Sequence, residues 1–165
     1  ILRQALESGN FTTYVGGDGM VGDDLFTGID ASALERMIIT RAGAYEGDSA
    51  TVFGELATAA GIQADAIYAP QAYDAAFLLA LAIEKNGTAD RAGLTDALRE
   101  IATAPGEVIL PGEWVKAKAL IAAGEDINYE GAGGTLDFDE VGDIDGVIVE
   151  IAVQDGKFVE VGVIQ

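Results

Sequence analysis

Hydrophobic residues recur along this chain with two different spacings, and together these spacings predict a mixed α/β protein. Helical spacing, with an apolar side chain every three to four positions, covers residues 1–8, 49–60, 67–87, 90–103 and 113–124. β-Branched and aromatic residues gather as in strands at residues 11–15, 38–40, 135–138, 147–154 and 157–164. With a broken helix over residues 23–37, the first two strands predict a β-α-β unit with a parallel pair.

Short local signals predict where several of these elements begin and end. Asp155-Gly156 stands between the last two strand-like runs and predicts a tight hairpin at the end of the chain. Ser49 is expected to cap one helix, and Gly87 to end the next. Residues 67–87 are apolar almost all round, so we expect that helix to be buried on most sides.

Composition excludes several classes of function. The chain carries 28 acidic and 9 basic residues, and its formal charge of −19 repels nucleic-acid phosphates and anionic lipids. It contains no Cys and no His, which removes thiol nucleophiles, disulfides, Ser-His-Asp triads and the usual zinc ligands. The longest unbroken apolar run, residues 75–83, is far shorter than the roughly 20 residues of a membrane-spanning helix. Most hydrolase and metalloenzyme functions are therefore improbable, and we expect no bound metal or cofactor.

Asp18 is the first candidate for a ligand contact. The strand predicted over residues 11–15 ends in a loop that contains Gly16, Gly17 and Gly19. In open α/β sheets, ligands bind just beyond the carboxyl ends of strands. A carboxylate there can accept charge-assisted hydrogen bonds from an ammonium group, and Gly17 and Gly19 leave room for the ligand.

Two other interpretations of this loop remain open. Residues 17–22 match G-x-G-x-x-G, the fingerprint of a dinucleotide-binding turn. Asp18 would oppose that ligand, since two like charges about 4 Å apart repel by roughly 4 kcal/mol at an effective dielectric constant of 20. Alternatively, Asp18 caps the helix that follows or stabilises a turn.

Five acidic side chains crowd residues 137–145 and raise the question of a calcium site, because Ca²⁺ prefers oxygen ligands. The spacing does not fit the EF-hand loop. Its positions 1 and 12 would fall on Val141 and Ala152, where carboxylates are required. We expect hydrogen-bonded turns here instead.

Several local sequences, in their order along the chain, resemble the second half of a type I periplasmic solute-binding protein. The family in question contains the branched-chain amino-acid and amide receptors of ABC importers. The similarity extends over essentially all 165 residues. Its most specific pieces are GGDG at residues 16–19, Tyr73-Asp74-Ala75, and the turn from Phe138-Asp139 to Gly142-Asp143.

The resemblance implies a two-lobed α/β clamp, with parallel βαβ units and a C-terminal hairpin, that closes about a hinge on a small solute. Such a protein is periplasmic, is not an enzyme, and delivers its solute to a membrane permease. Residues 1–44 are expected in the second lobe, and residues 45–138, mostly helical, in the first lobe. Residues 139–165 are expected to return to the second lobe as the hairpin.

The same resemblance implies roles for particular residues. Asp18 would hold the ammonium group of the ligand, between Gly17 and Gly19, and Tyr68 would pack against the ligand. Because Asp is one methylene shorter than the Glu of the branched-chain receptor, an amino acid and an amide-like solute both remain open. In an alternative interpretation, Tyr68 contacts no ligand and only leads into the apolar helix.

The resemblance also leaves the biological role and the extent of the protein open. A ligand-sensing regulator of the same fold is an alternative to an import receptor, and a nicotinamide-dinucleotide enzyme that uses residues 17–22 is a less favoured one. We expect the chain to be part of a protein about twice its length. Apolar surface would then be covered by another copy or by a segment outside this chain.

Overall fold

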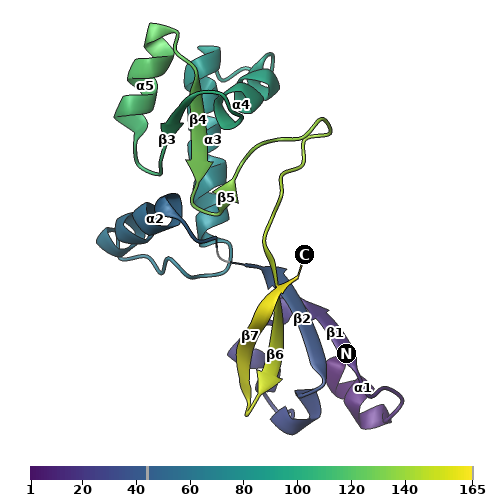
Figure 1. Cartoon of the computed structure of the whole chain (residues 1–165). Coiled ribbons are helices and arrows are strands. Elements are labelled where there is room, and N and C mark those ends of the chain that lie inside the picture. Colours follow the sequence, from purple (N-terminus) through teal and green to yellow (C-terminus); the bar gives the residue numbers. More distant parts are fainter. Residues whose placement is uncertain (44, 165) are drawn as a thin grey trace. The chain divides into compact units, whose positions relative to one another are not determined.

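The computed structural model describes residues 1–43 and 45–164, and its contacts divide the chain into two compact units (Figure 1). Unit 1 consists of Ile1–Gly43 and Val147–Gln165, and unit 2 consists of Ala44–Gly146. Residues 139–146 group with unit 2, in part because the Arg99 guanidinium donates a hydrogen bond of 2.6 Å to the main-chain carbonyl of Asp139.

Unit 1 is built on a four-stranded sheet with the order β1-β2-β6-β7. Its strands are β1 (Tyr14–Gly17), β2 (Met37–Ala42), β6 (Ile148–Gln154) and β7 (Lys157–Ile164). β1 and β2 are parallel, as expected, and the other two pairs are antiparallel. The helical segments are α1 (Leu2–Ser8) and three 3-10 helices, η1 (Asp18–Met20), η2 (Asp23–Phe26) and η3 (Ala31–Leu34).

The core of unit 1 lies on one face of this sheet. Along β2, Met37 and Ile39 are buried while Ile38 between them is exposed, which is the alternation of a half-buried strand. Val149 and Ile151 continue the buried face on β6. Apolar residues of α1 and of the 3-10 segments pack against this cluster.

The prediction of a broken α-helix over residues 23–37 is wrong, because the structure has two short 3-10 helices there. Gly28 takes a φ of 68° between them. The Asp30 carboxylate then accepts a hydrogen bond of 3.0 Å from Ser32 N–H and starts η3. Each piece is therefore interrupted before an α-helical turn can extend.

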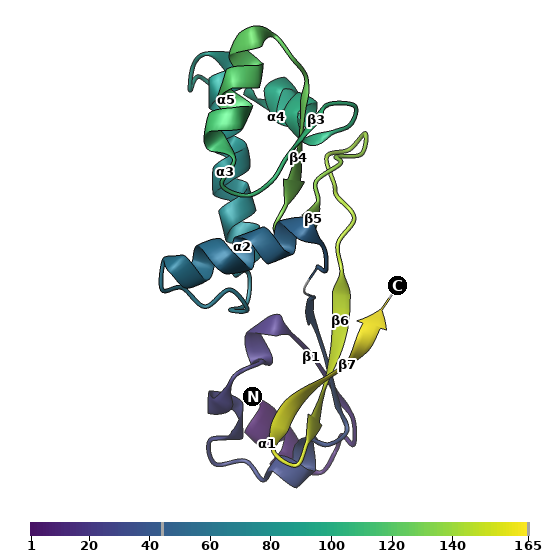
Figure 2. The ribbon, with the colours of Figure 1, turned by 60° about the vertical axis from the view of Figure 1, so that its left-hand side comes forward.

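The C-terminal hairpin is confirmed. β6 and β7 pair from Gln154 and Lys157 outward and form the long ribbon at the yellow end of the chain (Figure 2). Asp155 and Gly156 have φ values of 49° and 71°, the left-handed conformation that a tight two-residue turn needs at both positions.

Unit 2 places four α-helices around a three-stranded sheet with the order β3-β4-β5. The helices are α2 (Asp48–Ala59), α3 (Ala69–Asn86), α4 (Leu94–Ala102) and α5 (Trp114–Ala123). The strands are β3 (Glu107–Ile109), β4 (Ile127–Gly131) and β5 (Gly134–Thr135). β3, α5 and β4 make a parallel β-α-β unit, so the predicted α/β class is confirmed.

Three expectations about unit 2 are wrong in detail. Gly47, and not Ser49, is the N-cap residue of α2, and Ser49 is buried in its first turn. α3 buries one face through residues such as Leu78 and Leu81, while Leu79 is 44% exposed. The strand expected over residues 135–138 is limited to β5, because the chain leaves β4 after two paired positions.

Candidate functional site

Asp18 lies where β1 ends and η1 begins. Gly17, the last residue of β1, is extended with φ −104° and ψ −179° and is the N-cap residue of η1, so Asp18 opens that 3-10 helix. The main-chain carbonyl of Asp18 accepts a hydrogen bond of 2.9 Å from Val21 N–H, and Asp18 is half-buried. Because β1 runs parallel to β2, Asp18 stands at the carboxyl end of a parallel pair.

The glycines around Asp18 differ in what surrounds them. A Cβ at Gly16 would lie 2.6 Å from the Sδ of Met20 and 2.8 Å from the Cε of Met37, so Gly16 allows these side chains to pack under the strand. A Cβ at Gly17 or Gly19 would meet no atom within 4 Å. The space beside Asp18 is therefore open at both glycines.

The dinucleotide interpretation lacks the helix that it requires. In that motif the pyrophosphate rests on the N-terminus of an α-helix that the glycine turn opens. Here Asp18–Met20 is a single 3-10 turn, and Asp23–Phe26 is another. Residues 17–22 thus fit the G-x-G-x-x-G sequence pattern but not the structure of the dinucleotide-binding motif.

Tyr68 is in unit 2, whereas Asp18 is in unit 1. It is the N-cap residue of α3, has the left-handed conformation with φ 64° and ψ 7°, and is 46% exposed. Its main-chain carbonyl accepts a hydrogen bond of 2.8 Å from Ala72 N–H, which begins the helix. A large residue with positive φ is uncommon and costs on the order of 1 kcal/mol, so this position merits a functional test.

Asp74 has a role that the sequence did not reveal. Its side chain is on α3 and only 3% exposed, and it accepts hydrogen bonds from Tyr129 Oη–H at 2.7 Å and from Ala132 N–H at 2.8 Å. Gly133 N–H donates a third, of 2.7 Å. These bonds tie α3 to β4 and the turn after it.

The glycines of this turn allow the close approach. A Cβ at Gly131 would lie 2.7 Å from the Asp74 Oδ2, so only glycine fits there without a shift. Burial raises the pKa of the Tyr129 hydroxyl far above its ordinary value of 10.0, and the hydrogen bond to Asp74 adds to this. In the sequence, the run Gly131-Ala132-Gly133-Gly134 indicates a turn. It does not indicate that Asp74, more than 55 positions away, binds this turn.

The acidic run after β5 forms a hydrogen-bonded turn, as expected. Asp139 Oδ1 accepts hydrogen bonds from Val141, Gly142 and Asp143 N–H at 2.9, 2.8 and 2.8 Å. The bond from Asp143, helped by the other two, lowers the pKa of the Asp139 carboxyl. Across residues 1–43 and 45–164, no group of three or more His, Cys, Asp or Glu side chains could hold a metal ion.

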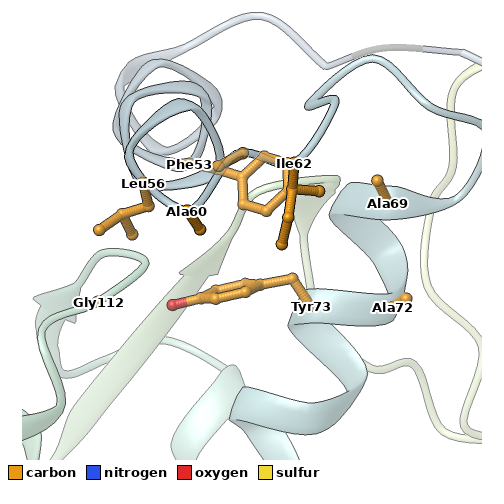
Figure 3. A pocket seen from close by; sticks show the side chains of 9 residues that line it. Phe53, Leu56, Ala60, Ile62, Ala69, Ala72, Tyr73 and Gly112 are labelled. Atoms are coloured by element: carbon orange, nitrogen blue, oxygen red, sulfur yellow. The ribbon is translucent and has the colours of Figure 1, made fainter.

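A pocket of about 540 Å³ opens in unit 2 between α2 and α3, and we call it the α2–α3 pocket (Figure 3). It is lined by Phe53, Leu56, Ala57, Ala60, Ile62, Ala69, Ala72, Tyr73 and Gly112. Burial raises the pKa of the Tyr73 hydroxyl, and a hydrogen bond with the Gly112 main chain partly opposes this. Phe53 is buried, whereas Leu56 is 39% exposed at this opening.

Two known proteins share features with the chain. A crystal structure of the leucine-binding protein LivK from Thermotoga maritima matches it with a TM-score of 0.61 and 24% sequence identity, over 99% of this chain and 40% of LivK. The chain has the fold of part of a periplasmic binding protein. The chemotactic signal transduction system substrate-binding protein BasB from Halobacterium salinarum is 37% identical over 70 residues, 42% of this chain and 17% of BasB.

The matches concern only part of each relative, since the chain spans less than half of LivK and the aligned segment a smaller share of BasB. Both relatives are named as binding proteins. No protein-family model matches the chain. None of the helices in the described part of the chain combines the length and apolar character needed to cross a membrane.

Proposed function

We propose that the chain is part of an extracytoplasmic, periplasmic solute-binding protein of an ABC importer. Its solute is a small amino acid of branched-chain type or an amide-like compound, which it hands to a membrane permease. The binding-protein fold and the names of both relatives support a solute-binding role. The observation that carries the proposal is Asp18, at the carboxyl end of β1, flanked by open space at Gly17 and Gly19.

The chemistry of this position favours a cationic group. A carboxylate can accept up to four hydrogen bonds, and those from an ammonium group are charge-assisted. The open space at Gly17 and Gly19 lets a ligand come close to the main chain. Main-chain donors would meet the carboxylate of an amino acid, and closure around the solute would favour the form that a permease accepts.

Tyr68 is proposed as a second contact, with its ring against the aliphatic part of the solute. Its exposure of 46% and its left-handed backbone support this role. We also propose that unit 1 belongs to the second lobe of the clamp and unit 2 to the first.

Isothermal titration calorimetry with leucine, isoleucine and leucinamide tests this proposal. The binding affinity is compared between wild type, Asp18→Asn and Asp23→Asn. Asp23 is an exposed acid of η2 in the same unit and controls for the loss of one charge. If the ammonium pair is desolvated, Asp18→Asn is expected to weaken binding by roughly 2–4 kcal/mol. Asp23→Asn should change it by less than about 0.5 kcal/mol.

A ligand pair isolates the group that Asp18 contacts. 4-Methylpentanoic acid has the carbon skeleton and carboxylate of leucine but no ammonium group. Any binding of this acid should not become weaker in Asp18→Asn. Equal affinities of wild type and Asp18→Asn for leucine and leucinamide would remove Asp18 from the site.

A second candidate function is solute sensing, and the similarity to BasB favours it because that protein is named as part of a chemotactic signalling system. The two roles share the binding site and differ in the partner of the loaded form. Solute-dependent stimulation of ATP hydrolysis by a reconstituted importer would support import. Solute-dependent binding to a chemotaxis transducer without ATP hydrolysis would support sensing.

A further inference from the structure

The α2–α3 pocket is concave and framed by several segments of one unit. Phe53 and Leu56 come from α2, Ile62 from the loop after it, and Tyr73 from the first turns of α3. Figure 3 shows the Tyr73 ring facing Phe53 and Ile62, with its hydroxyl directed toward Gly112. The ring centroids of Phe53 and Tyr73 are 5.3 Å apart and tilted by 54°, so the two rings support one another.

The pocket leaves apolar side chains in contact with solvent. Ile62 is 59% exposed and Leu56 is 39% exposed, although both line the pocket. Gly112 brings the turn before α5 close to α2, since a Cβ there would lie 2.9 Å from the Cδ1 of Leu56. The volume of about 540 Å³ is within the range of roughly 300–1,000 Å³ typical of small-molecule sites.

The pocket lining offers no partner to an anion. None of the lining residues is charged, and the Tyr73 hydroxyl is the polar side-chain group among them. Residues 42–84, which supply every lining residue except Gly112, contain six acidic residues and no Lys or Arg. A carboxylate or sulfonate would find no cationic partner among the lining residues, and the net charge of −19 of the chain opposes the approach of an anion.

We propose that the α2–α3 pocket binds an uncharged, mainly apolar small molecule, aromatic or branched aliphatic, with one polar group beside the Tyr73 hydroxyl. The lining residues all belong to unit 2, whereas Asp18 belongs to unit 1. The lining includes neither Asp18 nor Tyr68, the two contacts proposed for the solute, so this pocket is proposed as a separate site. Either proposal can fail without the other.

The test uses two fluorescent probes with the same aromatic skeleton. N-Phenyl-1-naphthylamine is uncharged, and 1-anilinonaphthalene-8-sulfonate carries a sulfonate. The 165-residue chain is expected to bind the uncharged probe saturably, at one site, and at least tenfold more tightly than the sulfonate. Equal affinity for the two probes, or a signal that never saturates, would overturn the proposal.

Matched variants locate the binding. Ala60→Phe fills the pocket, while Ala59→Phe adds the same ring at an exposed neighbour that does not line it. Ala60→Phe is expected to weaken binding of the uncharged probe about tenfold, and Ala59→Phe less than twofold. Circular dichroism checks that both variants fold. Equal effects of the two substitutions would place the probe elsewhere and refute the assignment.

A second pair covers the case in which the phenylalanine variants do not fold. Ile62→Ala removes an exposed lining side chain, and Ile67→Ala removes an exposed isoleucine of the same loop outside the lining. The first should weaken binding of the uncharged probe about fivefold, and the second should leave it nearly unchanged. Unchanged binding in Ile62→Ala would contradict the proposal.

Discussion

At the scale of residues, Asp74 shows how one buried carboxylate organises unit 2. Three donors from β4 and the turn after it hold this side chain, which is 3% exposed. A buried charge is tolerated only when such donors replace water, so each of them matters to stability. Tyr129 is itself fully buried. Its ring also packs against that of Phe77, with the two ring centroids 5.0 Å apart.

Tyr129→Phe tests this network. The substitution removes the hydroxyl that donates to Asp74 and should lower the free energy of unfolding of unit 2 by about 1–3 kcal/mol near pH 8. Trp114, the one tryptophan of the chain, lies in unit 2 beside Phe77 and reports its unfolding in urea. Tyr14→Phe is the control, because the Tyr14 hydroxyl bonds an exposed carbonyl in unit 1.

The raised pKa of Tyr129 also predicts a dependence on pH. The unfolded chain releases this proton near the ordinary pKa of 10.0, whereas the folded chain retains it. The resulting stabilisation is complete below pH 10 and is lost as the pH rises above it, by at most about 1.4 kcal/mol per pH unit. The advantage of wild type over Tyr129→Phe should therefore shrink by about 1.4 kcal/mol between pH 9 and pH 11. A constant difference across this range would contradict the assignment.

At the scale of elements, local sequence was most informative where one short signal decides the backbone. Asp155-Gly156 predicted the hairpin because few residues adopt positive φ at both turn positions. The apolar spacing of residues 90–103 predicted α4, whose Ala97 and Ile101 are buried. β4 was missed because its sequence, INYEG, mixes Asn and Glu with apolar residues, and its burial comes from distant elements that pack against it, α4 and α3 among them.

Gly156→Ala should weaken the hairpin. Its φ of 71° disfavours a Cβ by about 1–2 kcal/mol, while the nearest atom to that Cβ would be Ala31 Cβ at an ordinary 3.4 Å. Gly156→Ala therefore introduces backbone strain without steric crowding. The amides of β6 and β7 should exchange with deuterium about fivefold to thirtyfold faster, as measured on peptides covering residues 148–164.

Gly162→Ala is the matched control for this substitution. Gly162 lies in β7, has no positive φ and would place its Cβ in open space. Exchange in the hairpin should be unchanged or slower in this variant, since alanine loses less backbone entropy than glycine on folding. Faster exchange in both variants would mean that the turn conformation is not the cause.

At the scale of the whole molecule, charge is the dominant feature. Nine basic residues can neutralise at most nine of the 28 acidic ones, which leaves the net charge of −19. Several of the ion pairs, such as Lys118 with Glu84 at 3.0 Å, involve partly exposed side chains. Exposed pairs of this kind contribute little to stability, so self-repulsion of the folded chain remains.

Salt should therefore stabilise the protein. Between 10 and 300 mM NaCl the Debye length falls from about 30 Å to below 10 Å, which screens repulsion between distant carboxylates. We expect the thermal midpoint to rise by about 2–4 °C for each kcal/mol gained. Choline chloride at the same ionic strength should act alike. A midpoint that falls or stays constant in both salts would show that repulsion does not limit stability.

The sequence by itself determined the α/β class, the parallel β1–β2 pair, the hairpin and the position of Asp18 beyond a strand. These features follow from neighbouring residues, whose spacing and backbone preferences act over a few positions. Only the tertiary structure decided the partners of Asp74, 55 to 59 positions away, and the α2–α3 pocket. Both depend on which distant segments meet, and the pattern of apolar residues states that a face is buried but not what it is buried against.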